Sequence, residues 1–143
     1  NGDIRCADDA ARMMAATGCD AVMIGRAAVG YPAIFSEVVG RLAGRPLPPP
    51  DVNQRIEVLR RFVLTSASCF GEARAARRMR TRLVWFANGM RHSSELRQAA
   101  GRIGSIAEAL ELIEAYRKAG ASRGAPAVIS AGPSRPVPPP PAG

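Results

Sequence analysis

Residues that commonly hold metals or form disulfides are scarce in this chain. Its 143 residues include one histidine, His92, and three cysteines, and only 5% of them are aromatic. The cysteines, at positions 6, 19 and 69, show no Cys-x-x-Cys spacing, so neither a zinc site nor a disulfide framework is expected. No apolar run approaches the roughly 18 residues that a membrane span needs. The sequence therefore predicts no bound metal and no membrane segment.

Apolar residues are nonetheless plentiful enough for a folded core. They make up 47% of the chain, which argues against wholesale disorder. The first residue is Asn1 rather than methionine, and no basic segment followed by an apolar one opens the chain. We therefore expect the C-terminal part of a longer protein, located in the cytoplasm.

Positive charge is concentrated in the second half of the chain. The whole sequence holds 20 Lys and Arg against 12 Asp and Glu, a net charge of +8. Residues 51–120 hold 13 basic and seven acidic side chains, whereas residues 1–50 hold five of each. Every basic residue except Lys118 is arginine, which suits bidentate contact with phosphate. The base composition of the gene explains the same bias, so charge alone leaves both interpretations open.

Proline divides the chain into segments. The run Pro46-Leu47-Pro48-Pro49-Pro50 favours extended backbone and predicts a linker at 46–50. Residues 121–143 contain seven prolines and little apolar mass, which predicts a disordered tail. Two folded segments are then expected, at 1–45 and 51–120.

Residues 1–45 alternate helix and strand signals. An apolar helical face at positions 10, 13, 14 and 17 follows two aspartates, and Gly18 is expected to end this helix. The apolar run Ala21–Ile24 indicates a buried parallel strand, and a short helical turn is expected after Gly25. A further helix follows Pro32, with Ile34, Phe35, Val38, Val39 and Leu42 facing inward. This is the helix–strand–helix pattern of an α/β protein.

Residues 51–120 are predicted to be all helical. Four helices are expected, at 51–70, 72–87, 94–100 and 105–120, with Asp51 and either Ser93 or Ser94 as caps of the first and third. Ser105 and Glu108 have the spacing of a capping box at the start of the fourth. The inward residues of the first and fourth helices are expected to be Ile56, Leu59, Val63, Ala67, Phe70, Ile106, Ala109, Leu110, Ile113 and Tyr116. The pattern is typical of a small helical bundle.

A glycine–arginine turn follows the expected strand. Gly25 lets backbone come close to a ligand, and the start of the next helix offers free N–H groups to an anion. Arg26 adds a guanidinium that suits phosphate. In a (β/α)8 barrel a phosphate site commonly lies after the last two strands. Spacing alone also permits an ordinary turn in which Arg26 pairs with a surface carboxylate.

Arginines also gather on one side of the helix expected at 72–87. Arg74, Arg77, Arg78 and Arg82 fall within an arc of about 140°, together with Trp85. The opposite side carries Ala75, Met79, Leu83 and Phe86, so one face is expected in the core. An aromatic ring beside arginines suits stacking on a nucleic-acid base. An ordinary solvated face, with the tryptophan packed on another helix, is the alternative.

Several segments resemble a known family. They are NGDI at 1–4, DAARMMAATGCDAVMIGRAAVGYPAIF at 9–35, FGEARAARRMRTRLVWFANGM at 70–90 and SELRQAA at 94–100. Together they resemble bacterial tRNA-dihydrouridine synthases, most closely the B-type subfamily. The resemblance covers residues 1–120 and implies the C-terminal slice of a (β/α)8 TIM barrel followed by a helical tRNA-binding domain, an α/β plus all-α chain.

The resemblance also implies an activity. Such enzymes reduce uridine in tRNA to 5,6-dihydrouridine with FMN, which NADPH re-reduces, and the full-length protein is expected to be a monomer. By position, Asn1, Gly2, Asp3, Gly25 and Arg26 would bind FMN. The arginine face and tryptophan described above, Arg74, Arg77, Arg78, Arg82 and Trp85, would bind tRNA.

The catalytic cysteine of the family has no match in this chain. Cys6 is expected at the start of a helix, and Cys69 is expected to be a small core residue. We therefore expect the isolated chain to be inactive. Two alternatives stay open: part of another FMN barrel oxidoreductase, and a non-catalytic RNA-binding remnant.

Overall fold

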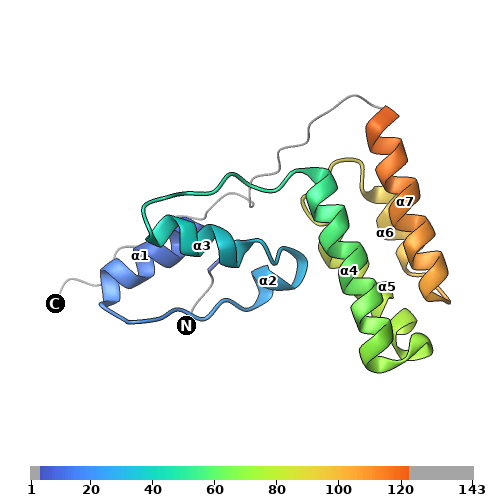
Figure 1. Cartoon of the computed structure of the whole chain (residues 1–143), viewed down its shortest axis with the longest axis horizontal. Coiled ribbons are helices and arrows are strands. Elements are labelled where there is room, and N and C mark those ends of the chain that lie inside the picture. The colour runs from blue at the N-terminus through green and yellow to red at the C-terminus, as the bar shows by residue number, and fades with distance from the viewer. Residues whose placement is uncertain (1–3, 123–143) are drawn as a thin grey trace.

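The computed structural model describes residues 4–122, and seven α-helices account for most of them (Figure 1). They are α1 (Ala7–Thr17), α2 (Arg26–Gly30), α3 (Ile34–Leu42), α4 (Val52–Phe70), α5 (Glu72–Ala87), α6 (Ser94–Ala100) and α7 (Ile106–Ser122). Within residues 4–122, no helix is both long and apolar enough to cross a membrane. The disordered tail predicted at 121–143 overlaps the end of α7, because residues 121 and 122 are helical. Residues 123–143 lie outside the described residues.

The first three helices share a small hydrophobic cluster. Its buried members are Ile4, Ala10, Ile34 and Val38, so α1 packs against α3. The α1 helix starts after Cys6, where the Asp9 carboxylate accepts the backbone N–H groups of Arg5 and Cys6 at 2.9 and 3.2 Å. It ends at Gly18, whose φ of 66° is left-handed, as predicted.

The strand predicted at Ala21–Ile24 was wrong. Residues 21–25 are irregular, and no strand forms anywhere in residues 4–122. A strand obtains its backbone hydrogen bonds from a neighbouring strand, and none is present within the described residues. Val22 and Ile24 still pack on the small cluster, whereas Met23 is 60% exposed. The apolar run is therefore only partly buried, with Val22 and Ile24 facing the small cluster and Met23 facing away from it.

Part of the expected inward face of α3 was also wrong. Ile34 and Val38 are buried, but Phe35 is 50% exposed and Val39 is 67% exposed. Leu42 is exposed as well. All five apolar positions cannot face α1 at once, because a helix presents only one stripe to one neighbour. The second stripe of α3 stays largely exposed among the described residues.

The last four helices close around a larger core. Asp51 caps α4, accepting the backbone N–H of Gln54 at 2.8 Å, and the Glu108 N–H donates to Ser105 Oγ at 3.1 Å at the start of α7. The caps predicted at Asp51 and Ser105 are thus confirmed, whereas the cap predicted for α6 is not, because Ser93 precedes that helix without a side-chain capping bond. The core contains Ile56, Leu59, Val63, Ala75, Met79, Leu83, Phe86, Ile106, Ala109 and Ile113 among its buried residues.

The end of α4 differs from its prediction. Phe70 is 45% exposed and Cys69 is exposed, although both were expected in the core. They occupy the last turn of α4, next to the Gly71 turn, where the packed part of the bundle has already ended. Ala67, one turn earlier, does pack against the core.

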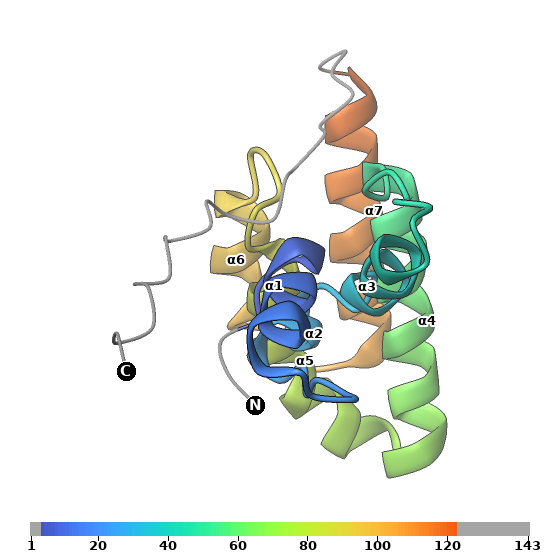
Figure 2. The same ribbon diagram turned by 90° about the vertical axis from the view of Figure 1, so that its left-hand side faces the viewer.

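The two groups of helices meet through α2 and α5 (Figure 1). In the rotated view, α1, α2 and α3 lie in front of the bundle (Figure 2). A Cβ placed on Gly30 would clash with the backbone carbonyl of Trp85, so only glycine allows this approach. The connection at 43–51 lies on the surface between the two groups.

Candidate nucleic-acid interface

Helix α5 separates its apolar and basic sides as predicted. Ala75, Met79 and Leu83 are almost fully buried in the bundle core. Of the predicted RNA-binding arginines, Arg74, Arg77 and Arg78 are exposed and Arg82 is half-buried. We call these four residues the arginine face. None of the four forms an ion pair within residues 4–122.

One arginine of α5 does have a structural role. Arg80 lies off the arginine face, and its Nε donates to the carbonyl of Ile103 at 2.8 Å. This bond joins α5 to the segment between α6 and α7. The arginines of α5 therefore divide into one that supports the bundle and four that form no ion pair within residues 4–122.

Trp85 lies between the arginine face and the first group of helices. Its side chain is 38% exposed, and it lines an open hollow of about 750 Å³ together with Gly25 and Arg26. Arg5, Tyr31 and Asn88 also line this hollow. The structure thus brings together two predicted sites that are 60 residues apart in sequence, the glycine–arginine turn and the aromatic of α5.

The glycine–arginine turn leaves room for a ligand. Among the described residues, apart from its two chain neighbours, no atom lies within 4 Å of a Cβ built on Gly25. The Gly25 carbonyl accepts the N–H of Ala28 at 3.1 Å, which closes the first turn of α2. Arg26 is exposed at the start of that helix. The other predicted FMN contacts, Asn1, Gly2 and Asp3, lie outside the described residues.

Arg55 connects the hollow's walls, although sequence reasoning missed it. It is only 7% exposed, and its guanidinium donates to the carbonyls of Phe86 and Asn88 at 3.1 and 3.3 Å. The guanidinium carbon also lies 5.2 Å from the ring centre of Tyr31. Burial lowers the pKa of Arg55, yet arginine stays protonated in proteins. Its burial could have been expected from the sequence, because Arg55 directly precedes Ile56 on the side of α4 that faces the core.

The hydroxyl group of Tyr31 is also fixed, by a residue of α3. Its hydroxyl donates to Glu37, and burial together with that hydrogen bond raises the pKa of Tyr31. The phenol therefore stays neutral at physiological pH. Tyr31, Arg55 and the end of α5 form a chain of contacts that fixes α2 against the bundle.

Phe70 was expected inside the bundle but lies next to the arginine face. The guanidinium carbon of Arg78 lies 4.5 Å from its ring centre. A second exposed ring, Phe62, is 36% exposed and contacts Phe86 with ring centres 5.7 Å apart. Its exposure could have been expected from the sequence, because Phe70 lies in the last turn of α4 before Gly71.

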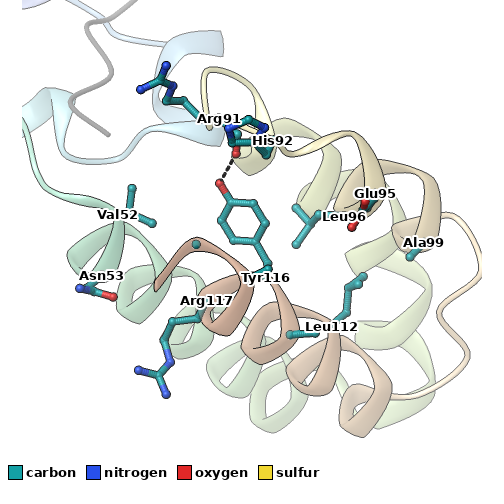
Figure 3. A pocket seen from close by; sticks show the side chains of 13 residues that line it. Val52, Asn53, Arg91, His92, Glu95, Leu96, Ala99, Leu112, Tyr116 and Arg117 are labelled. Carbon is teal, nitrogen blue, oxygen red and sulfur yellow. Dashed lines mark hydrogen bonds between the residues drawn. The ribbon is translucent and has the colours of Figure 1, made fainter. Parts of the chain in front are cut away.

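A second cavity lies away from the predicted residues (Figure 3). It has a volume of about 440 Å³ between the start of α4, helix α6 and helix α7. Tyr116 lies in it, and its hydroxyl donates to the Arg91 carbonyl at 2.6 Å. His92 is at its rim, exposed and with a φ of 53°. Among residues 4–122, no group of three or more His, Cys, Asp or Glu could hold a metal ion.

Comparison with known proteins identifies the family. Residues 1–121 match the family described as "Dihydrouridine synthase (Dus)". The chain belongs to the dihydrouridine synthase family. It is 40% identical over 109 residues to a "Probable tRNA-dihydrouridine synthase" of Mycobacterium leprae, covering 76% of this chain and 28% of that protein.

Relatives named as B-type synthases are similar too. The chain is 39% identical over 103 residues to the "tRNA-dihydrouridine synthase B" of Xanthomonas axonopodis pv. citri, covering 71% of this chain and 31% of that protein. It is 32% identical over 117 residues to that of Proteus vulgaris, covering 81% of this chain and 36% of that protein. The chain thus spans about a third of the length of these dihydrouridine synthases. The resemblance noted in the sequence is confirmed at the level of the family.

Proposed function

We propose that this chain is the C-terminal part of an FMN-dependent tRNA-dihydrouridine synthase that reduces uridine to 5,6-dihydrouridine in tRNA, with NADPH as reductant. The observation that carries the proposal is the shared hollow. It is lined by Gly25 and Arg26 on one side and by Trp85 of α5 on the other. A cofactor turn and an RNA-binding helix would have to meet in this way for tRNA to reach a flavin.

The residues of the turn fit the phosphate of FMN. Gly25 offers open space, and the exposed Arg26 and Arg5 both line the same hollow. A guanidinium binds phosphate through two parallel hydrogen bonds, and a glycine lets the phosphate approach the backbone. Asn1, Gly2 and Asp3 are proposed to contact the same cofactor. When bound, reduced FMN supplies the hydride for the uracil ring.

The arginine face is proposed to bind the tRNA backbone. Four guanidiniums without carboxylate partners in the described chain repel one another, and a polyanion relieves that repulsion. Trp85 continues this surface toward the hollow and is proposed to stack on a base or ribose. Because Trp85 lines both surfaces, its contact would orient the bound RNA toward the turn.

None of the three cysteines is among the residues that line the hollow. Cys6 and Cys19 flank α1, and Cys69 lies at the far end of α4 from Arg55 and the hollow. We therefore propose that the chain by itself binds RNA without reducing it. The complete enzyme is proposed to be monomeric and cytoplasmic.

The RNA-binding proposal is tested with two charge-matched variants. Arg74→Gln/Arg77→Gln removes two charges from the arginine face, and Arg97→Gln/Arg102→Gln removes two exposed charges from the α6 side. Fluorescence anisotropy of labelled tRNA is measured against salt concentration. We expect only the first variant to weaken binding and to reduce the slope of log Kd against log salt, by about 0.7–0.9 for each phosphate that is no longer neutralised. Equal effects of the two variants would contradict the proposal.

The flavin proposal needs a ligand-matched control. FMN and riboflavin differ only in the phosphate, so NMR titrations of the chain with each ligand isolate its contribution. We expect FMN, but not riboflavin, to shift the backbone amide resonances of Gly25 and Arg26. The substitution Arg26→Gln should abolish that shift. Identical shifts with riboflavin would show that the turn does not bind the phosphate.

A further inference from the structure

Two exposed phenylalanines follow the seam between α4 and α5 on the side of the arginine face. Phe70 is 45% exposed and lies under Arg78, and Phe62 is 36% exposed and contacts Phe86. Large apolar rings beside unpaired guanidiniums are costly to leave in water, since each exposes apolar area that burial would stabilise. Because these rings lie next to cations, they are also suited to bind a flat, negatively charged ligand.

The two aromatic pairs share one register. Phe62 and Phe70 are eight residues apart on α4, and Phe86 and Arg78 are eight residues apart on α5. Because α4 and α5 run antiparallel (Figure 1), the contacts of Phe62 with Phe86 and of Phe70 with Arg78 lie across the same seam. The rings are therefore separated along the helix by about 12 Å, at a rise of 1.5 Å per residue. Arg82 lies midway between Arg78 and Phe86 on α5.

The resulting strip alternates aromatic rings and cations. Its order along the seam is Phe70 with Arg78, then Arg82, then Phe62 with Phe86. An exposed aromatic ring offers a face to any nucleic-acid base, and arginine adds phosphate binding and cation–π attraction. Double-stranded RNA has no free base face to offer, because its bases are stacked on one another.

We propose that this strip, Phe62, Phe70, Arg78 and Arg82, is a stacking site for unpaired bases of the bound RNA. The proposal rests on the proposed RNA-binding function and adds to it a preference for single-stranded segments. The guanidinium over Phe70 holds the ring in place and would be displaced by, or stack upon, an incoming base. The phosphates on either side of that base would then lie next to Arg74 and Arg82.

The positive charge of the strip favours RNA over a protein as its ligand. The strip shares Arg78 and Arg82 with the arginine face, which has no ion-pair partner among residues 4–122. The acidic residue of α5 is Glu72, in its first turn. A protein partner would need to bring carboxylates to this surface, whereas a nucleic acid brings both phosphates and flat rings. RNA satisfies both chemical features of the strip.

The test compares substitutions that keep apolar character but remove the ring. Phe70→Leu is the main variant, Phe70→Trp is the conservative rescue, and Leu64→Ala is the control at another exposed apolar position of α4. Each 143-residue variant is titrated with a labelled single-stranded RNA 12-mer and with the same 12-mer annealed to its complement. Circular dichroism melts check that each variant folds.

We expect Phe70→Leu to weaken single-strand binding by about fivefold or more, the size of one base–aromatic stacking interaction. Duplex binding should stay within twofold, and the salt slope should not change because every phosphate-binding arginine is still present. Phe70→Trp should restore single-strand binding, and a 2-aminopurine base in the oligonucleotide should be quenched by the unchanged chain but less by Phe70→Leu.

Two results would overturn the stacking site. One is an equal effect of Phe70→Leu and Leu64→Ala on single-strand binding, and the other is an equal weakening of single-strand and duplex binding. If Arg74→Gln/Arg77→Gln weakens binding while Phe70→Leu does not, only the stacking site fails. If neither variant changes RNA binding, the proposed function of the arginine face fails with it.

Discussion

The two groups of helices differ in how completely they bury their own apolar residues. Among the residues that the structure describes, the bundle of α4–α7 has a core of 14 buried residues, while the cluster of α1–α3 has four. In the smaller group, Met23, Phe35 and Val39 remain half-exposed or more. Where a segment buries its own apolar face, its sequence is enough to predict which residues are buried. Where a segment leaves apolar residues exposed, their burial depends on other parts of the protein that pack against it.

The comparison predicts that core substitutions in the bundle have the largest effect. Leu83 is fully buried, and Leu83→Ala should lower the free energy of unfolding by about 2–5 kcal/mol through reduced burial and a cavity. Leu64→Ala, at a position that is 49% exposed, should change it far less. Calorimetry of both variants measures the difference. Similar effects of the two variants would mean that the bundle core is not packed as described.

A smaller effect is expected where the two groups meet. Gly30→Ala forces a methyl group against the Trp85 carbonyl, which should cost about 1–3 kcal/mol. No described atom lies within 4 Å of a Cβ built on Gly120, so Gly120→Ala serves as the control. Amide hydrogen exchange should become faster in α2 and at the end of α5 with the first variant only. Unchanged exchange in α2 would show that this approach does not hold the groups together.

Replacing Arg55 sharpens the same comparison. Arg55→Met removes hydrogen bonds from a buried cation to two carbonyls at the end of α5, which should destabilise the protein by about 1.5–3 kcal/mol. Arg55→Lys keeps the charge but not the fork of donors, so it should rescue stability only in part. Chemical denaturation with tryptophan fluorescence follows both variants, because Trp85 lies beside these hydrogen bonds. Full stability of Arg55→Met would contradict this role.

The smallest effect is expected at Asp9, in the smaller group. Burial raises the pKa of Asp9, but the N–H groups of Arg5 and Cys6 and the charge of Arg12 outweigh it, so the pKa is lowered overall. A lowered pKa in the folded state stabilises the protein above the unfolded pKa, about 3.9, and this contribution disappears as the pH falls through the folded value.

Asp9→Asn should therefore cost about 1 kcal/mol near pH 7, a typical value for a helix cap, and less below pH 3. Thermal melts at pH 7 and pH 3 measure the cost at each pH, and Asp20→Asn, at an exposed aspartate after α1, is the control. A cost that does not depend on pH would contradict the assigned charge of Asp9.

The sequence was most informative where periodicity and burial agree. The helices of the bundle, the caps at Asp51 and Ser105 and the two sides of α5 could all be predicted, because each depends on residues within a few turns. The predicted strand at 21–24 could not form within the described residues, since a strand requires a neighbour. Apolar runs alone do not reveal whether that neighbour is present.

The candidate site was predictable only in its parts. Gly25, Arg26 and Trp85 were identified from local chemistry, but their meeting in one hollow depends on Gly30 and Arg55, which have no local motif. Phe70 was assigned to the core because helical spacing does not show where the packed layer of a bundle ends. Tertiary contacts, rather than propensity, decide these positions.

Ultraviolet cross-linking of tRNA to the unchanged chain, with mass spectrometry of the linked peptides, tests the central claim most directly. The account predicts cross-links in peptides that contain Phe70, Trp85 and the arginine face between them. Cross-links confined to α6, α7 and the cavity around Tyr116 would contradict it and place the RNA interface away from the arginine face.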